Sequence, residues 1–125
     1  MKDYTDVLGR VLVALLFLLA GIGKLGGAFE GTQGYMEAFG VPGMLLPLVI
    51  LVEIGGALLL IAGYQTRWTA LALAGFSIVS AVIFHSDFGD QAQMTNFLKN
   101  LSIAGGLLVL YANGPGSYSL DNRNK

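Results

Sequence analysis

Apolar residues fall into four stretches along the chain, separated by short segments rich in glycine, proline and charged residues. The stretches cover about residues 7–25, 46–63, 69–85 and 97–111. At ~1.5 Å per residue, an 18-residue helix covers about 27 Å, which is close to the thickness of a bilayer core. The pattern therefore predicts an all-α, polytopic membrane protein in which four transmembrane helices form an antiparallel bundle.

The segments between these stretches contain residues that typically begin or end helices. Gly26-Gly27 follows the first stretch, and Asn113-Gly114-Pro115-Gly116 follows the fourth. Thr66 is a candidate N-cap for the third stretch. The fourth stretch is short, so its helix is expected to begin within residues 91–96, with Thr95 or Asn96 as the cap.

The composition supports a single membrane domain over residues 1–125. Hydrophobic residues make up 54% of the chain and charged residues only 12%, whereas soluble domains have about 25% charged residues. A net charge of −1 without a basic face gives no indication of a nucleic-acid partner. The chain contains no cysteine and one histidine, which excludes thiolate and iron–sulfur sites and bis-histidine haem within the chain, and no metal site is predicted.

Basic residues are distributed unequally between the two predicted sides of the bundle. Lys24 and Lys99 lie on one side, and the other side holds Lys2, Arg10, Arg67, Arg123 and Lys125. The excess of positive charge predicts that both termini lie in the cytoplasm. A cleaved signal peptide is not expected, because Asp3 and Asp6 precede the first apolar stretch and no A-x-A site follows it.

Glu53 is the most unusual residue of the second apolar stretch, which otherwise contains mainly Leu, Ile, Val, Gly and Ala. A charged side chain at mid-membrane costs about 2.5–3.5 kcal/mol even on conservative scales. Glu53 must therefore be protonated, paired or next to a wet cavity. Lys99 is the first candidate for its ion-pair partner because a long lysine side chain can span the difference in depth, and Arg10 and Lys24 are the next candidates.

Several other polar residues are expected in the same half of the bundle as Glu53. His85 closes the third stretch, and Asn96, Lys99 and Asn100 share one face of the fourth at i, i+3 and i+4. Together with Lys24 and Glu53 they are candidate ligand-binding residues, and Glu53 and His85 are the candidates for proton transfer. Such a cluster next to apolar helix faces suits a molecule with a polar head and a hydrophobic tail. A quinone has this shape, and a lipid would fit as well.

The chain resembles the DoxX family of small four-helix membrane proteins, including its short inner-membrane members from enteric bacteria. The resemblance covers nearly the whole chain. It is carried by Arg10, the 17–25 stretch FLLAGIGKL, Gly40-Val41-Pro42, Glu53 with Gly55-Gly56, Gly63 with Thr66-Arg67, His85, Lys99-Asn100-Leu101 and the 114–121 stretch GPGSYSLD.

The resemblance implies a bacterial inner-membrane location and a link to quinone-coupled oxidation, as an oxidoreductase component or a quinone binder. It supplies no catalytic residues, and the absence of cysteine excludes a thiol-based role within this chain. The implied partners are the lipid bilayer, quinone and other membrane redox subunits. Two alternatives remain open: a non-catalytic assembly or stress-response protein whose polar cluster is structural, and a small transporter, which would require a homo-oligomer.

Overall fold

The protein is built almost entirely from helices. The computed structural model describes residues 2–85, 87 and 89–122, and within these it contains five α-helices, three short 3₁₀ helices and no strand. The all-α prediction is confirmed, but the predicted four-helix count omitted one helix. The elements are α1 (Lys2–Gly23), η1 (Gly26–Ala28), α2 (Phe29–Ala38), η2 (Gly43–Leu45), α3 (Leu46–Ala62), α4 (Thr66–Phe84), α5 (Gln91–Asn113) and η3 (Leu120–Asn122).

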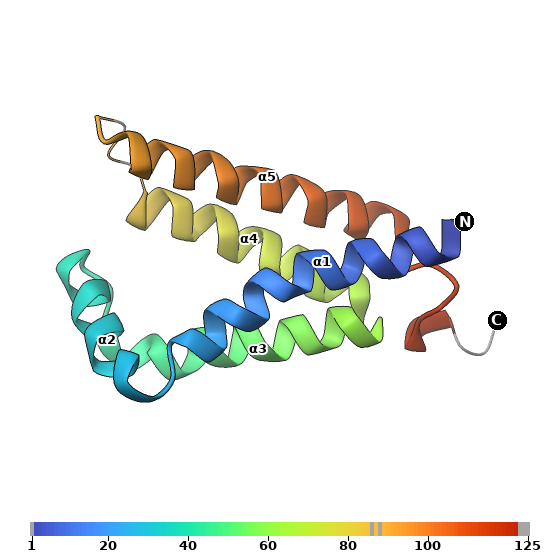
Figure 1. The fold of residues 1–125 in the computed structure, drawn as a ribbon, viewed down its shortest axis with the longest axis horizontal. Coiled ribbons are helices and arrows are strands. Elements are labelled where there is room, and N and C mark those ends of the chain that lie inside the picture. The colour runs from blue at the N-terminus through green and yellow to red at the C-terminus, as the bar shows by residue number, and fades with distance from the viewer. Residues whose placement is uncertain (1, 86, 88, 123–125) are drawn as a thin grey trace.

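The four long helices form two closely packed antiparallel pairs, α1 with α3 and α4 with α5 (Figure 1). The start of α1, the α3–α4 turn and the end of α5 lie together at what we call the terminal end of the bundle. The start of α5 and the short helix α2 lie at the opposite end, which we call the α2 end. The predicted topology, with both ends of the chain on the side of the α3–α4 turn, therefore matches the structure.

Helix α2 is not predicted by the pattern of apolar residues, and its own sequence is a poor helix former. It contains Gly31 and Gly34, and each glycine costs about 1 kcal/mol in a helix interior. Tertiary contacts stabilise the helix instead, since Met36 packs with Leu46 and Ile50 in a small core at the start of α3. Propensity alone could not have predicted that packing.

Among the residues that the structure describes, three segments are long and apolar enough to cross a membrane: Lys2–Gly23, Gly43–Ala62 and Thr66–Phe84. The predicted fourth span, residues 97–111, lies in α5, which has 23 residues but begins with a polar half and is not among the three. The outer surface is apolar; Leu51 is 66% exposed and Val109 is 62% exposed. Such a surface suits lipid chains rather than water.

Small side chains allow the two helix pairs to pack closely. The main core combines Ala14, Ala57, Ala70, Ala74 and Ala104 with larger residues such as Phe17 and Leu73. Helix α1 approaches α3 closely at Gly21, where an added Cβ atom would lie 3.2 Å from the Glu53 Cβ atom. Small residues at helix crossings are typical of membrane bundles, in which close packing drives association.

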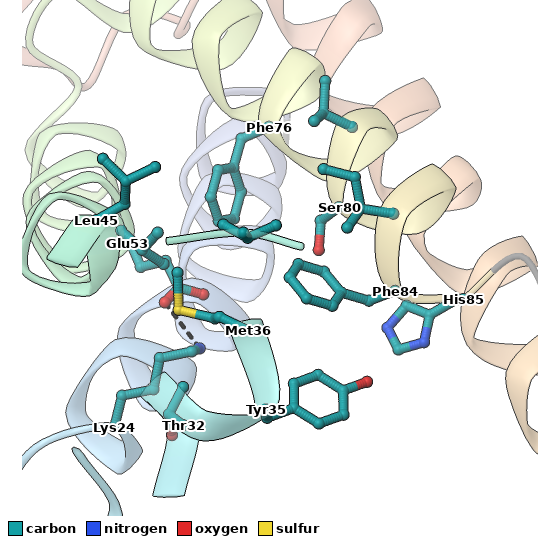
Figure 2. Close-up of a pocket in the computed structure, with 14 residues that line it drawn as sticks. Lys24, Thr32, Tyr35, Met36, Leu45, Glu53, Phe76, Ser80, Phe84 and His85 are labelled. Atoms are coloured by element: carbon teal, nitrogen blue, oxygen red, sulfur yellow. Dashed lines mark ion pairs between the residues drawn. The ribbon is translucent and has the colours of Figure 1, made fainter. Parts of the chain in front are cut away.

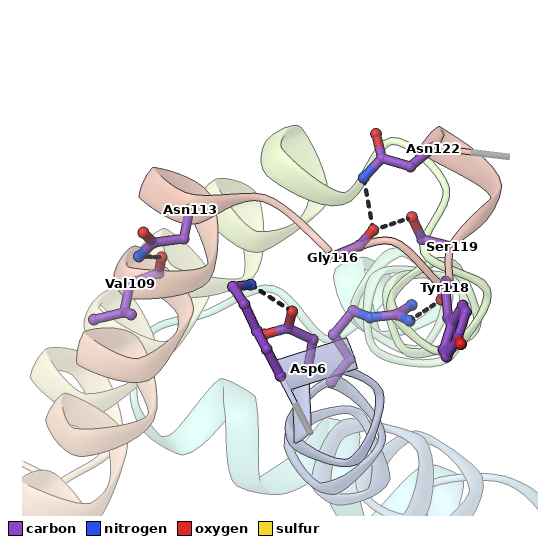
Figure 3. Close-up of polar contacts among 9 residues, drawn as sticks. Asp6, Val109, Asn113, Gly116, Tyr118, Ser119 and Asn122 are labelled. Atoms are coloured by element: carbon purple, nitrogen blue, oxygen red, sulfur yellow. Dashed lines mark hydrogen bonds and ion pairs between the residues drawn. The ribbon is translucent and has the colours of Figure 1, made fainter. Parts of the chain in front are cut away.

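Arg10 does not pair with Glu53, contrary to the expectation that it was a candidate. Its side chain is 2% exposed and lies at the terminal end. Its guanidinium group donates hydrogen bonds to the carbonyl oxygens of Leu60 (3.0 Å) and Ile61 (3.2 Å), and to that of Tyr118 (Figure 3). Arg10 therefore caps the C-terminus of α3 and ties it to the C-terminal tail, which gives the cation a structural role.

Thr66 is also not the N-cap that the sequence predicted. Gln65 occupies the cap position, and the carboxylate of Asp121 accepts hydrogen bonds from the backbone N–H groups of Gln65 (2.8 Å) and Thr66 (2.9 Å). Burial would raise the pKa of Asp121, but these hydrogen bonds outweigh it and hold the pKa below its usual value. The tail thus supplies the cap of α4 from 55 residues away along the chain.

Helix α5 begins at Gln91, within the expected segment, but neither Thr95 nor Asn96 is its cap. Asp90 occupies that position, and its side chain accepts a hydrogen bond from the backbone N–H of Ala92 at 2.9 Å. At the other end, Gly114 stops the helix with a positive φ of 80°, as the glycine-rich segment after the fourth stretch predicted.

Candidate functional site

The partner of Glu53 is Lys24. Lys24 Nζ lies 2.8 Å from Glu53 Oε1, and the glutamate side chain is only 6% exposed. Lys24 follows the last residue of α1, and its side chain turns back along its own helix, where Nζ also donates to the carbonyl oxygen of Ala20 at 3.2 Å. Because α1 and α3 pack tightly at Gly21, this path brings the ammonium group directly to the carboxylate.

The expectation that Lys99 is the first partner of Glu53 is wrong. Lys99 belongs to α5, which packs against α4 rather than against α3, and its side chain is exposed. A lysine side chain is long enough to reach Glu53, as predicted. The sequence does not show, however, which helix is adjacent to α3. Lys24, the lower-ranked candidate, has both the reach and the neighbouring helix.

A large hollow lies beside the Lys24–Glu53 pair, between α2, α3 and α4. We call it the larger hollow; its volume is about 460 Å³. Its walls are mostly apolar, with polar groups at separate places. In Figure 2 the Lys24–Glu53 pair lies on one side of the hollow and His85 on the other. The lining residues are Lys24, Thr32, Tyr35, Met36, Val41, Leu45, Val49, Glu53, Phe76, Val79, Ser80, Ile83, Phe84 and His85.

An aromatic cluster joins α2 to the end of α4 next to this hollow. The rings of Tyr35 and Phe84 are stacked with centroids 5.4 Å apart, and Phe39 contacts both rings at 5.0 and 5.2 Å. Tyr35 and Phe84 line the hollow, so this cluster forms part of its wall (Figure 2). Helix α2 therefore covers one side of the site.

A second hollow of about 210 Å³ lies between α1, α4 and α5, and we call it the smaller hollow. It shares Lys24, Glu53, Phe76, Ser80 and His85 with the larger one. The ion pair is therefore in the wall between the two spaces. The residues that line the smaller hollow alone are Leu16, Phe17, Ala20, Ser77, Lys99, Asn100 and Ile103.

The structure brings together five of the six candidate ligand-binding residues. Lys24, Glu53 and His85 line both hollows, and Lys99 and Asn100 line the smaller one. Asn96 is half-buried on α5 but lines neither hollow.

Hydrogen bonds position two of these candidates. His85 Nδ1 lies 3.3 Å from Gln93 Oε1, and Asn100 Nδ2 donates to the carbonyl oxygen of Ser77 at 3.4 Å. Glu53 Oε1, in contrast, receives no well-aligned hydrogen bond from any group that the structure describes, although the Lys24 ammonium is in ion-pair contact with it. The carboxylate thus retains capacity to accept a further hydrogen bond.

The residues that α2 contributes to the site were not predicted from the sequence. Thr32, Tyr35 and Met36 line the larger hollow, and none of them carried a signal comparable to a charge in an apolar stretch. One feature could have indicated them: Tyr35 and Phe39 are spaced at i, i+4, so both rings lie on one face if the segment is helical.

Comparison with known proteins identifies relatives over nearly the whole chain. The DoxX family model matches residues 5–86. Inner membrane protein YqjF of Escherichia coli is 50% identical over 121 residues, which is 97% of this chain and 92% of that protein. Inner membrane protein YphA of the same organism is 39% identical, over 94% of this chain and 88% of that protein.

A more distant similarity extends to a eukaryotic protein. The Surfeit locus protein 4 homolog of Schizosaccharomyces pombe is 28% identical over 99% of this chain, but the match covers only 39% of that protein. No solved structure matches the chain.

Proposed function

Because this chain belongs to the DoxX family and is similar along its length to two inner-membrane proteins, we propose that it binds a quinone in the larger hollow. The observation that carries this proposal is the arrangement of the hollow's walls. An apolar space of about 460 Å³ has a lysine–glutamate pair on one side and a histidine on the other. Sites for small molecules usually have 300–1,000 Å³ and a few polar groups among apolar walls.

The residues present fit the chemistry of a quinone head. The Lys24 ammonium is a hydrogen-bond donor for a quinone carbonyl oxygen on one side of the hollow (Figure 2). On the opposite side, His85 Nδ1 carries the N–H that faces Gln93 Oε1, so Nε2 is an acceptor for a hydroxyl group of the reduced quinol. The rings of Tyr35, Phe76 and Phe84 offer aromatic surface for stacking. The apolar outer surface of the bundle gives an isoprenoid tail access from the bilayer.

A bound quinone would supply two-electron, two-proton redox chemistry. Toward that chemistry, Lys24 and His85 orient the ring, and Glu53 holds or releases a proton beside it. Electrons would come from another membrane subunit, so we place the protein as a quinone-binding component of an oxidoreductase. We also propose that the terminal end faces the cytoplasm, because more of the described basic residues lie there (Lys2, Arg10 and Arg67) than toward the α2 end (Lys24 and Lys99).

A second candidate function is structural, and the ion pair itself favours it. Lys24 and Glu53 satisfy each other's charge and link α1 to α3, which would specify the packing of the bundle without any ligand. On this alternative the protein serves membrane assembly or stress response without chemistry.

Two valine substitutions on α4 test the quinone proposal. Val79 lines the larger hollow, whereas Val82 lies on the same helix, outside both hollows, and is equally exposed at 56% compared with 57%. We expect a short-chain quinone to raise the unfolding temperature of the purified wild-type protein and of Val82→Trp in lipid nanodiscs. The same quinone should not stabilise Val79→Trp, whose indole fills the hollow.

Equal stabilisation of both variants would place the ligand elsewhere. No stabilisation of the wild type, together with no quinone in an organic extract of the membrane-purified protein, would favour the structural alternative. The Glu53→Gln variant further distinguishes the quinone proposal from the structural alternative. Loss of quinone binding in a folded variant supports a ligand site. Collapse of the bundle supports an architectural role.

A further inference from the structure

The smaller hollow differs from the larger one in chemistry as well as in size. Its walls carry Ser77, Ser80, Asn100 and Lys99, which supply hydroxyl, amide and ammonium groups. Lys99 is exposed at the surface, in the half of α5 that begins at the α2 end. The hollow therefore extends from a polar part of the surface to the buried carboxylate of Glu53.

We propose that the smaller hollow is a water-filled route through which Glu53 exchanges protons with the membrane surface at the α2 end. Its volume of about 210 Å³ accommodates several water molecules, each of which occupies about 30 Å³ in the liquid. A buried water needs two to four polar partners, and the serine, asparagine and lysine side chains provide them. Ionisable residues within membrane proteins commonly face such wet cavities.

Glu53 is suited to proton exchange from this side. Its side chain is in the wall of the smaller hollow and is 6% exposed, so a water in the hollow can bind the carboxylate. The charged and titratable groups that face it are Lys24 just after α1, His85 just after α4 and Lys99 from α5. A proton delivered by water forms an O–H bond on the carboxylate and removes the charge that holds the Lys24 ammonium.

Protonation of Glu53 connects the two hollows, and this connection rests on the ligand site proposed above. Lys24 lines both spaces, so its release from a neutral Glu53 leaves the ammonium group available to a carbonyl oxygen in the larger hollow. Protonation through the smaller hollow would thereby strengthen ligand binding in the larger one. The water route itself is measured without any ligand, so it can fail or succeed independently of quinone binding.

The chain lacks cysteine, so single cysteines report on hydration without a background. Asn100 lines the smaller hollow, while the adjacent Leu101 is 38% exposed on another face of α5. In nanodiscs, we expect a small water-soluble methanethiosulfonate to modify Asn100→Cys at least about tenfold faster than Leu101→Cys, because only a hydrated thiol forms the reactive thiolate. Equal rates, or faster reaction of Leu101→Cys, would show that the hollow is dry.

Infrared spectroscopy of the carboxyl group tests the proton exchange itself. The C=O band of the protonated Glu53 carboxyl group is identified by its absence in Glu53→Gln. The rate at which this band shifts in deuterated water gives the rate of proton exchange at Glu53. Ala20 lines the smaller hollow, so Ala20→Leu should slow that exchange about tenfold, whereas Ala72→Leu, on an exposed part of α4, should leave it unchanged. An unchanged rate in a folded Ala20→Leu variant would overturn the proposal even if quinone binding had been demonstrated.

Discussion

Lys24 Nζ lies 2.8 Å from Glu53 Oε1, although Lys24 lies beyond the last residue of α1 and Glu53 is seven positions inside α3. Seven residues correspond to a depth of ~10 Å along a helix. The lysine side chain covers that distance by turning back over Ala20, to whose carbonyl oxygen it also donates. The charge of Glu53, the one charged residue of α3, is therefore neutralised by a lysine at the end of the neighbouring helix.

Removal of one partner of this pair should destabilise the protein. Lys24→Met leaves the carboxylate of Glu53 buried without its counter-charge, and we expect a loss of about 1–3 kcal/mol in the free energy of unfolding. This is less than the 3–5 kcal/mol of a fully buried pair, because the Lys24 side chain is 26% exposed. Equilibrium unfolding in mixed micelles measures this loss of stability.

The double variant Lys24→Met/Glu53→Leu serves as the control for this prediction. It removes both charges and should recover most of the lost stability. A double variant that is as unstable as the sum of the two single variants would mean that the two side chains do not interact.

The close approach of α1 to α3 predicts a strong effect at Gly21. A Cβ atom there would lie 2.6 Å from Ile54 Cγ1, so Gly21→Ala should push the helices apart, and we expect a loss of about 1–3 kcal/mol. Gly9→Ala is the matched control in the same helix, because its Cβ would meet nothing within 4 Å. Gly9→Ala should be neutral or slightly stabilising, and equal unfolding midpoints for the two variants would contradict the packing.

Arg10 should be essential for the terminal end of the bundle. Arg10→Met removes hydrogen bonds to three carbonyl oxygens, on Leu60, Ile61 and Tyr118, and we expect a loss of about 3 kcal/mol. Limited proteolysis should also cleave the C-terminal tail faster in this variant. Arg67→Met, at an exposed arginine, should change stability by less than about 0.5 kcal/mol, and similar losses in both variants would argue against a capping role.

Asp121 should make the stability depend on pH in the acidic range. Its pKa is lower in the folded protein than in the unfolded chain, so its contribution is fully present above about pH 4 and disappears as the pH falls through the folded pKa. Asp121→Ala should therefore cost about 1 kcal/mol at pH 7 and progressively less as the pH falls below about 4.

Thermal unfolding of the wild type and of Asp121→Ala over this pH range gives this difference, and Ser117→Ala, an exposed change in the same tail, is the control. A difference between wild type and Asp121→Ala that stays constant from pH 7 to pH 2 would show that the charge of Asp121 does not support the cap of α4.

Local signals in the sequence were sufficient for several features of the fold. Apolar runs of span length predicted the long helices, and glycine at position 114 predicted the end of α5, because both depend on residues close together in the chain. The caps were harder, since the group that caps α4 is Asp121, 55 residues away from the N–H that it binds. Helix α2 could not be predicted from propensity, because packing of Met36 stabilises it.

The candidate site, like the fold, is predicted in part by local sequence and decided in part by tertiary structure. A carboxylate in an apolar stretch identified Glu53 from the sequence alone, since desolvation of a charge is costly wherever the helix packs. Which lysine neutralises it depends on which helix lies next to α3, and only the tertiary structure decided that this is α1, with Lys24, and not α5, with Lys99. The hollows on either side of the pair were likewise decided in three dimensions, because each is enclosed by residues that are distant in the chain and brought together by helix packing.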